Sequence, residues 1–376
     1  MKKSKVYLTS ILLLLFYTCN NNNDDNCVEL KPTQKEFLVL GKPIKIIQLE
    51  TSESSKIGAI SKTEFDIVND RIFVMSDFNV FIFDNEGQFI HKLKKGRGPG
   101  EISIIVSFSV NTGSKLLYVL DNTNRICVFD YEGNMLNEYP ITGFNSLAIK
   151  VIDDENAFLL CNWVGGNEKK FVGLYNFKEK NIVKKFVSSE DSQYPKLARF
   201  MENNFTVNGE KLFFTSSNIF GLYEFKEGEF EKILSYDLGE RSVPKRFSDK
   251  FLEGRRRTIF EDEALKNGYV PFILYSFCFK GYYFAIIDDN RKSCYVIDSK
   301  NLSKVFLNGT LATYFNLPDV KSFRYPKEIK KDYLVFSCNP LDFFEIDEVE
   351  KTKSIEIGNL VVEINYDSNP FLIVVD

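Results

Sequence analysis

A strand–turn–strand pattern recurs along most of this chain and limits the folds open to it. The clearest copies span 71–93 and 115–139. Each copy has an apolar strand, an alternating strand that ends in Asp, a turn with Gly, and a further strand. An Asp side chain bonds nearby backbone N–H groups and Gly accepts positive φ, so the pair favours a compact hairpin. The pattern therefore indicates repeated antiparallel sheets.

The spacing of the repeat predicts a propeller. Six residues mark the end of the alternating strand in successive copies: Asp84, Asp130, Asn176, Glu224, Asp298 and Asp347. Subtracting their numbers gives steps of 46, 46, 48, 74 and 49 residues. A period of about 40–50 residues with four strands per unit is typical of a β-propeller. We therefore predict an all-β fold, a six-bladed β-propeller of four-stranded blades.

The long step and the two ends complete this prediction. Residues 243–268 are rich in Glu, Lys and Arg and lack a strand pattern, which predicts a helical insertion between blades four and five. Strands are expected in 37–50 and in 371–375. We expect them to pair in one sheet, because such pairing removes exposed strand edges from the ring.

The amino terminus has the form of a secretory leader. Three lysines precede a short apolar run that ends at Thr18, and Cys19 follows directly, before a tract rich in Asn and Asp. This order resembles a bacterial lipoprotein leader with Cys19 as the lipidated residue, although Phe16 and Thr18 depart from the usual residues there. The expected layout is a signal peptide at 1–18, a polar tether at 19–36 and the propeller at 37–376.

Composition excludes several classes of function. The formal charge of −4, about −7 without the three leader lysines, argues against a nucleic-acid binder. His91 is the one histidine, so His-based catalysis or zinc binding would depend on it. The seven cysteines contain no C-x-x-C pair, and the spacing of Cys278 and Cys294 leaves open whether they are bridged.

Unlike the repeated hairpin, a glycine-rich loop occurs at a single place in the chain. It consists of Gly96, Arg97, Gly98, Pro99, Gly100 and Glu101. It follows the hairpin VFIFDNEG. This combination resembles the six-bladed β-propeller lipoproteins of Bacteroidetes, which are similar in shape to NHL-repeat propellers. The resemblance implies the fold, a location in the cell envelope, and a binding role on one face; it implies no catalytic residue. We interpret the loop mainly as a tight crossover in which Gly permits close backbone approach, with ligand contact by Arg97 and Glu101 as the alternative.

Three further groups are candidate sites. Arg255, Arg256 and Arg257 lie in the helical insertion, where they could contact an anion or form a solvated, charge-balanced helix face. Trp163, the one tryptophan, could offer an aromatic platform to a sugar or peptide, or pack between blades. Asp121, Asp288 and Asp289 follow strands and could ligate Ca²⁺ or another divalent metal, or simply serve as turn residues.

From these features we predict a non-enzymatic binding or scaffold lipoprotein of the outer membrane or periplasm. It would be held by a lipid anchor, need no cofactor, and present its loops to a protein, peptide or glycan partner rather than to nucleic acid. The alternative is a metal-dependent hydrolase or lyase of the lactonase-like propeller type, acting on a sugar derivative. That alternative requires carboxylates from several blades to converge on the channel.

Overall fold

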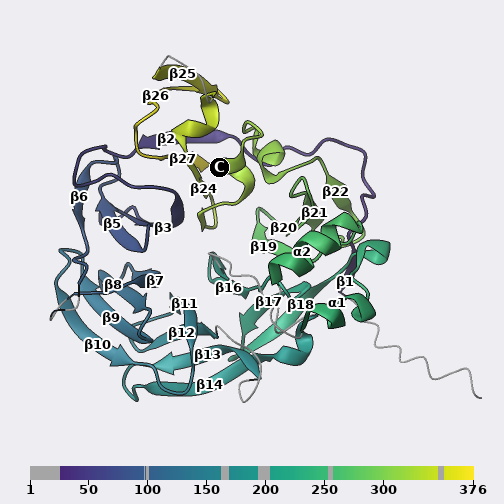
Figure 1. Cartoon of the computed structure of the whole chain (residues 1–376), viewed down its shortest axis with the longest axis horizontal. Helices are drawn as coiled ribbons and strands as arrows, with labels where there is room; N and C mark the ends of the chain where they lie inside the picture. The colour runs from purple at the N-terminus through teal and green to yellow at the C-terminus, as the bar shows by residue number, and fades with distance from the viewer. Residues whose placement is uncertain are drawn as a thin grey trace, which may run out of the picture.

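The computed structural model describes residues 26–96, 98, 101–161, 169–193, 204–252, 257–345 and 351–376. Six antiparallel sheets stand in a ring, with successive sheets following the chain (Figure 1). We call the region along the axis of this ring the channel. The predicted six-bladed β-propeller of four-stranded blades is confirmed. The signal peptide and Cys19 lie outside the described residues. Within those residues, no helix is both long and apolar enough to cross a membrane.

The first five blades each take four consecutive strands. Blade one is β3 (Ile60–Asp66), β4 (Arg71–Ser76), β5 (Asn79–Phe83) and β6 (Phe89–Lys92). Blade two is β7 (Ile105–Asn111), β8 (Leu116–Asp121), β9 (Arg125–Asp130) and β10 (Met135–Pro140). Blade three is β11 (Ser146–Val151), β12 (Asn156–Cys161), β13 (Lys170–Asn176) and β14 (Asn181–Ser188). Blade four is β15 (Phe205–Asn208), β16 (Lys211–Phe214), β17 (Gly221–Lys226) and β18 (Glu229–Asp237). Blade five is β19 (Ile273–Phe279), β20 (Tyr282–Ile287), β21 (Cys294–Asp298) and β22 (Val305–Leu307).

Blade six is built from both ends of the chain. Its strand order is β23 (Glu328–Ile329), β24 (Leu334–Cys338), β27 (Phe371–Val375) and β2 (Pro43–Gln48). The expected pairing of amino-terminal and carboxyl-terminal strands is confirmed, since β2 runs antiparallel to β27. The ring is thus closed by backbone hydrogen bonds between strands more than three hundred residues apart.

The sixth sequence unit was assigned wrongly. The segment before Asp347, in its described part up to residue 345, does not form the third ring strand after β24. The chain forms a 3₁₀ turn, η6 (Pro340–Phe343), and later a hairpin of β25 (Thr352–Ile357) and β26 (Leu360–Asn365). The proposed marker Asp347 lies outside the described residues. The third strand is instead β27, which is buried along its whole length and so suits a position covered by sheets on both sides.

Alternate residues of the central strands face different neighbouring blades. In β4, Ile72 and Val74 join a buried cluster with blade six, whereas Phe73 and Met75 join a cluster with blade two. Burial of both faces explains why the central strands, the second and third of each blade, are almost continuously apolar. Apolar burial of this extent is the main force that holds the sheets together.

The hairpin turns behave as the repeat predicts. Asp84 Oδ1 accepts hydrogen bonds from the backbone N–H groups of Glu86 and Gln88, at 3.0 and 2.8 Å. Gly87 follows with φ of 87°. A side chain there would also meet the Gln48 carbonyl oxygen, 2.2 Å from the position of a Cβ. Glycine is therefore required both for the turn and for close approach to β2.

The amino-terminal segment binds the outside of the ring. Strand β1 (Cys27–Glu29) pairs in parallel with β18 as a fifth strand of blade four. The Thr33 N–H then donates to Val305 O in blade five at 2.9 Å, before β2 enters blade six. The second half of the segment expected to be a polar tether therefore lies against blades four and five (Figure 1).

The predicted insertion between blades four and five is confirmed as two short helices, α1 (Lys245–Leu252) and α2 (Arg257–Lys266). Phe260 of α2 is fully buried and packs on Phe272, ring centroids 5.9 Å apart. Cys278 and Cys294 are unbridged thiols; Cys294 lies opposite Ile286 and Cys278 opposite Tyr283, so the two do not face each other across strands.

Asn369 joins the closing blade to blade one. Its side chain accepts from the Ile57 N–H and donates to the carbonyl oxygens of Glu50 and Ser55, at 2.9, 2.7 and 2.8 Å. It is 3% exposed. Removal of the amide would leave the buried Ile57 N–H and Ser55 carbonyl without these partners, whereas Glu50 O would keep its hydrogen bond from Ser55 Oγ.

We therefore expect Asn369→Ala to lower the free energy of unfolding by about 3 kcal/mol, measured by urea denaturation. Asn365→Ala is the matched control, because Asn365 is exposed and its side chain accepts a hydrogen bond only in the turn that follows β26. The control should cost less than about 1 kcal/mol. Equal losses in the two variants would contradict the assigned role of Asn369.

Candidate functional site

Polar side chains on the innermost strands connect neighbouring blades. These strands belong to separate sheets, so they lack the continuous ladder that pairs strands within a blade. Both carboxylate oxygens of Glu328 accept from the Phe65 N–H, at 3.1 and 3.0 Å. Glu64 Oε2 accepts from the Val110 N–H at 3.0 Å, and Ser109 Oγ accepts from the Val151 N–H at 3.2 Å. Blades six, one, two and three are thereby connected around the channel.

Three lysines surround these two carboxylates. Lys62 Nζ lies 2.9 Å from Glu64 Oε1, and Lys330 Nζ lies 2.8 Å from Glu328 Oε1. Lys150 Nζ lies 3.6 Å from Glu64 Oε2, which is too long for a hydrogen bond. Lys62 also donates to the Phe108 carbonyl. Lys62 and Lys330 thus have close partners, whereas Lys150 has only a longer-range attraction.

The surroundings shift the pKa values of these groups in different directions. Burial alone would raise the pKa of Glu64, but the positive charges of Lys150, Lys62 and Lys330 outweigh it and lower the pKa to about 2. Burial raises the pKa of Glu328 against the opposing effect of Lys330. Burial lowers the pKa of Lys150, while the charge of Glu328 raises that of Lys330.

This charged cluster lines a cavity of about 40 Å³ inside the channel. The walls come from β3, β11, β15 and the segment that leads into and out of β23. The residues that line it are Lys62, Thr63, Glu64, Lys150, Phe205, Thr206, Val207, Lys327, Glu328, Ile329 and Lys330. Four of them are lysines and two are glutamates, so the channel cavity carries a net charge of +2 by subtraction.

A larger cleft of about 360 Å³ lies at one mouth of the channel. Strands alternate in direction within each blade, so one face of the ring carries the connections between blades and the turns between second and third strands. The mouth cleft lies on this face. The residues that line the mouth cleft are Ala59, Ile60, Lys292, Lys321, Ser322, Arg324, Tyr325, Lys327, Ser337, Asn339, Asp342 and Pro370. Lys327 lines both the mouth cleft and the channel cavity.

The mouth cleft has an excess of positive charge. Its four cations face one carboxylate, Asp342, which already accepts from the backbone N–H and hydroxyl of Ser322. Lys292 is neutralised by Asp288. Lys321 and Arg324 have no hydrogen bond or ion pair within the described residues. The cleft is therefore suited to a negatively charged ligand.

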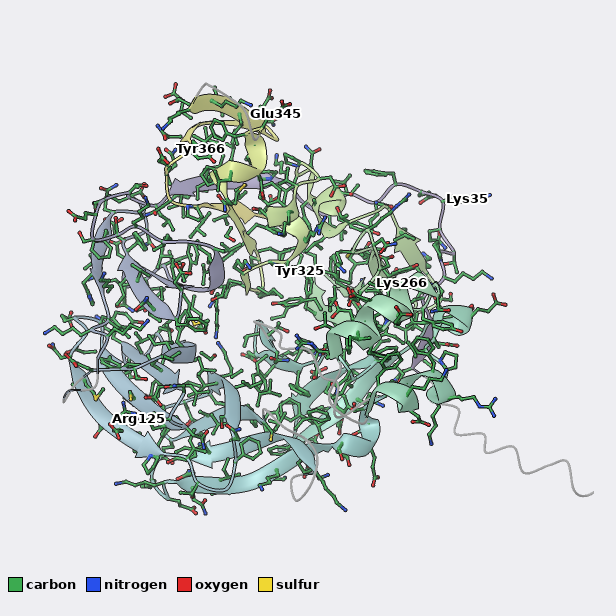
Figure 2. The ribbon with its side chains drawn as sticks, in the orientation of Figure 1. Lys35, Arg125, Lys266, Tyr325, Glu345 and Tyr366 are labelled. Carbon is green, nitrogen blue, oxygen red and sulfur yellow. The ribbon has the colours of Figure 1, made fainter. Side chains whose placement is uncertain are left out.

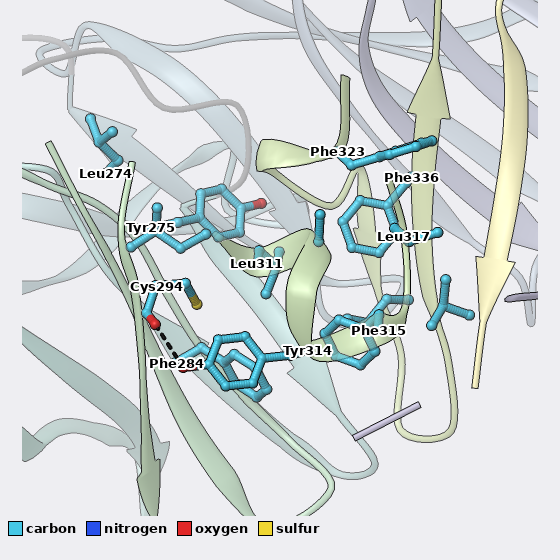
Figure 3. Packing of buried hydrophobic residues seen from close by; sticks show 14 of the residues in the cluster. Leu274, Tyr275, Phe284, Cys294, Leu311, Tyr314, Phe315, Leu317, Phe323 and Phe336 are labelled. Atoms are coloured by element: carbon cyan, nitrogen blue, oxygen red, sulfur yellow. Dashed lines mark hydrogen bonds between the residues drawn. The ribbon is translucent and has the colours of Figure 1, made fainter. Parts of the chain in front are cut away.

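Hydrophobic packing holds the backbone segment that carries Lys321 and Arg324. They are the first and last residues of the 3₁₀ turn η5 (Lys321–Arg324). Phe323, between them, is fully buried and packs edge-on against Phe336 of β24, with ring centroids 6.1 Å apart (Figure 3). The preceding 3₁₀ turn η4 (Leu311–Phe315) fills the space between blades five and six with Tyr314 and Phe315. The next residue after η5, Tyr325, lies beside the centre of the ring (Figure 2).

The side chain of Glu101, the last residue of the glycine-rich loop, forms a hydrogen bond within that loop. Glu101 accepts from the Gly98 N–H at 2.8 Å, and the Gly96 N–H donates to Ile102 O at 2.9 Å. A Cβ on Gly96 would lie 2.0 Å from the Glu101 carboxylate. Glu101 thus has a structural contact, and Arg97, Pro99 and Gly100 lie outside the described residues.

The three metal candidates are not brought together. Asp121 ends β8 in blade two and binds Arg125 Nε at 2.7 Å, whereas Asp288 and Asp289 follow β20 in blade five. Asp289 accepts from the backbone N–H groups of Arg291 and Ser293, as a turn residue does. No group of three or more His, Cys, Asp or Glu side chains is placed to hold a metal ion in the part of the chain that the structure describes.

The remaining candidates give no defined site within the described residues. Arg257 begins α2 and is exposed. Arg255, Arg256 and Trp163 lie outside the described residues. The cluster that the structure does assemble was missed from the sequence. Its signal was the presence of charges within the first strand of a blade, as in Lys62-Thr63-Glu64, whereas the second and third strands of that blade are largely apolar.

Comparison with known proteins places the chain in a family. The model described as "Domain of unknown function (DUF4934)" matches residues 24–376. The chain belongs to this family. A similar solved structure is the crystal structure of a "Putative exported protein" from Bacteroides fragilis NCTC 9343, with a TM-score of 0.69 and 13% identity. The match covers 93% of this chain and 99% of the other, and it shows a shared fold. No curated protein matches this chain.

The low pKa of Glu64 predicts a defined acid response. Because the pKa is below its ordinary value of 4.5, the carboxylate stabilises the fold above pH 4.5, and this contribution is lost as pH falls toward about 2. A shift of this size corresponds to about 3 kcal/mol.

We expect Glu64→Gln to flatten the decline of unfolding free energy between pH 4.5 and 2.5, measured by urea denaturation. Glu86→Gln is the control, because Glu86 is exposed and its ion pair with Lys45 contributes little. An unchanged acid response in Glu64→Gln would contradict the electrostatic role of this residue.

Proposed function

We propose that this protein is a binding propeller whose mouth cleft takes an acidic oligosaccharide. The observation that carries the proposal is the pair of cations, Lys321 and Arg324, at a cleft of about 360 Å³. That volume is in the range of small-molecule sites, which is about 300–1,000 Å³. Cations without a protein partner gain most from a ligand that brings carboxylate or sulfate groups.

The other lining groups favour a sugar. Ser322, Ser337 and Asn339 supply hydroxyl and amide groups around the cleft, and Tyr325 supplies an aromatic ring. Tyrosine combines an apolar face with a polar tip, which matches the mixed character of a sugar ring. Burial of Phe323 holds the backbone of η5 before a ligand arrives, so that binding orders the side chains of Lys321 and Arg324 but not the segment that carries them.

The binding test uses the double variant Lys321→Gln/Arg324→Gln. The matched control is Lys300→Gln/Lys304→Gln, which removes the same charge from exposed positions around the β21–β22 turn of the opposite face. Binding of an oligogalacturonate, a neutral maltooligosaccharide and a Glu-rich peptide would be measured by titration calorimetry at two salt concentrations.

We expect the wild type to bind the oligogalacturonate, with affinity that falls as salt rises. The cleft variant should bind about tenfold more weakly, because two charge-assisted contacts are lost, and the control should be unchanged. Preference for the neutral sugar or the peptide, or wild-type affinity in the cleft variant, would overturn the proposal.

We further propose that the protein is an envelope lipoprotein anchored through Cys19. Support comes from the leader, from Cys19 and the polar tract after it, and from the exported description of the B. fragilis neighbour. Lipid attachment at Cys19 would place the ring at a membrane surface with a short tether.

Cys19→Ala should shift the protein from the membrane fraction to the soluble fraction and abolish incorporation of labelled fatty acid. Cys27→Ala is the matched control, since Cys27 starts β1 and follows the same polar tract. Membrane association that survives Cys19→Ala would refute the anchor.

A further inference from the structure

We propose that the channel cavity is a second binding site, which takes one oxyanion group, a carboxylate, phosphate or sulfate, between Lys150 and Thr63. It lies inside the ring, between β3 and β11, and not in the mouth cleft. The argument depends on charge balance, on the hydrogen-bonding groups left over, and on size.

The charge balance favours an anion. The channel cavity has four lysines and two glutamates, and most of these groups are withdrawn from water. The side chains of Lys62, Lys150 and Lys330 are 9%, 20% and 34% exposed. Apart from Lys327, which has a partner of its own, three lysines face two glutamates, and Lys150 is the cation in excess. An excess cation that is partly withdrawn from water is costly, and a bound anion is a direct way to offset it.

The donor count identifies where the anion would lie. Each carboxylate accepts from a backbone N–H and forms an ion pair with a closer lysine, although Glu64 Oε1 makes no hydrogen bond within the described residues. Lys150 has three donor hydrogens and no hydrogen-bond acceptor within the described residues. Thr63, 1% exposed, has a buried hydroxyl that makes no hydrogen bond there. Both side chains line the same cavity, and both could donate to one oxyanion.

The size limits the occupant. One water needs about 10–15 Å³ of such space, so about 40 Å³ holds a few waters or one small oxyanion group, and a sugar ring is too large. Lys150 and Lys330 keep part of their side chains exposed, so the cavity communicates with solvent.

The alternative to a bound anion is a cavity that holds only water. Burial lowers the pKa of Lys150, and Lys62 and Lys330 face it alongside Glu64 and Glu328, so a neutral Lys150 solvated by water would also relieve the charge. Such a cavity would show no specific affinity for an anion. The two cases are therefore separable by binding.

Two sources could supply the oxyanion: free ions in solution, or the acidic group of a ligand in the mouth cleft, since Lys327 lines both spaces. The second source rests on the proposed function, whereas the first does not. The chemistry at Lys150 and Thr63 is the same in both.

The experiment titrates inorganic phosphate, and separately acetate, into the soluble form, residues 26–376, by calorimetry at constant ionic strength. Lys150→Met and Thr63→Val remove the two donors while keeping their approximate size. Lys178→Met is the control, because Lys178 is 79% exposed and pairs with Glu155.

We expect one saturable site in the wild type, about tenfold weaker binding in Lys150→Met, and about threefold weaker binding in Thr63→Val. The control should match the wild type. Thr63→Val keeps the test valid if Lys150→Met fails to fold. No saturable binding of either ion to the wild type, or wild-type affinity in both channel variants, would overturn the proposal.

Competition then separates the two sources. If phosphate displaces the oligogalacturonate and Lys150→Met weakens the binding of both, the acidic group of the ligand occupies the channel cavity. If phosphate binds equally with and without the oligogalacturonate, and also binds to Lys321→Gln/Arg324→Gln, a free ion occupies it. Phosphate binding that persists while the oligogalacturonate fails to bind would refute the mouth-cleft function and leave the channel site supported.

Discussion

The pairing of β2 with β27 is the constraint on which the whole ring depends. Five blades fold from consecutive segments, but the sixth exists only when strands from the two ends meet. Closure buries both faces of blade six, against blade five on one side and blade one on the other, which an open stack of sheets would leave exposed. Asn369 extends this closure to blade one through the segment that follows β2. The outer contacts of β1 and Thr33 reinforce the same arrangement from blades four and five.

Closure also creates the channel and its chemistry. The innermost strands converge, so their backbone N–H groups need partners from side chains of the neighbouring blade. Glu64 and Glu328 supply them, and the lysines then compensate the buried carboxylates. Most of the cluster therefore serves the structure. Lys150 and Thr63 are left over from this network, and the functional proposal for the channel begins with them.

Several features could be predicted from the sequence because they follow from local chemistry. The Asp–Gly turns need only a side-chain acceptor and positive φ, so they were visible at Asp84 and Gly87. The helical insertion was visible as a break in strand periodicity. The assignment of Asp347 to the end of a ring strand failed because the segment LDFFEID before it and β27 both carry large apolar residues that suit a strand. Only the competition between them for the space beside β24 decides which one joins the sheet.

By itself, the sequence determined the all-β class, the number of blades and the helical insertion, because hydrophobic alternation and turn residues act over a few neighbouring positions. The tertiary structure alone decided which strand completes blade six and which charges meet. Lys62, Lys150 and Lys330 come from three separate parts of the chain, and their separation in sequence carries no sign of contact. They converge because the ring brings the first strands of different blades to one axis.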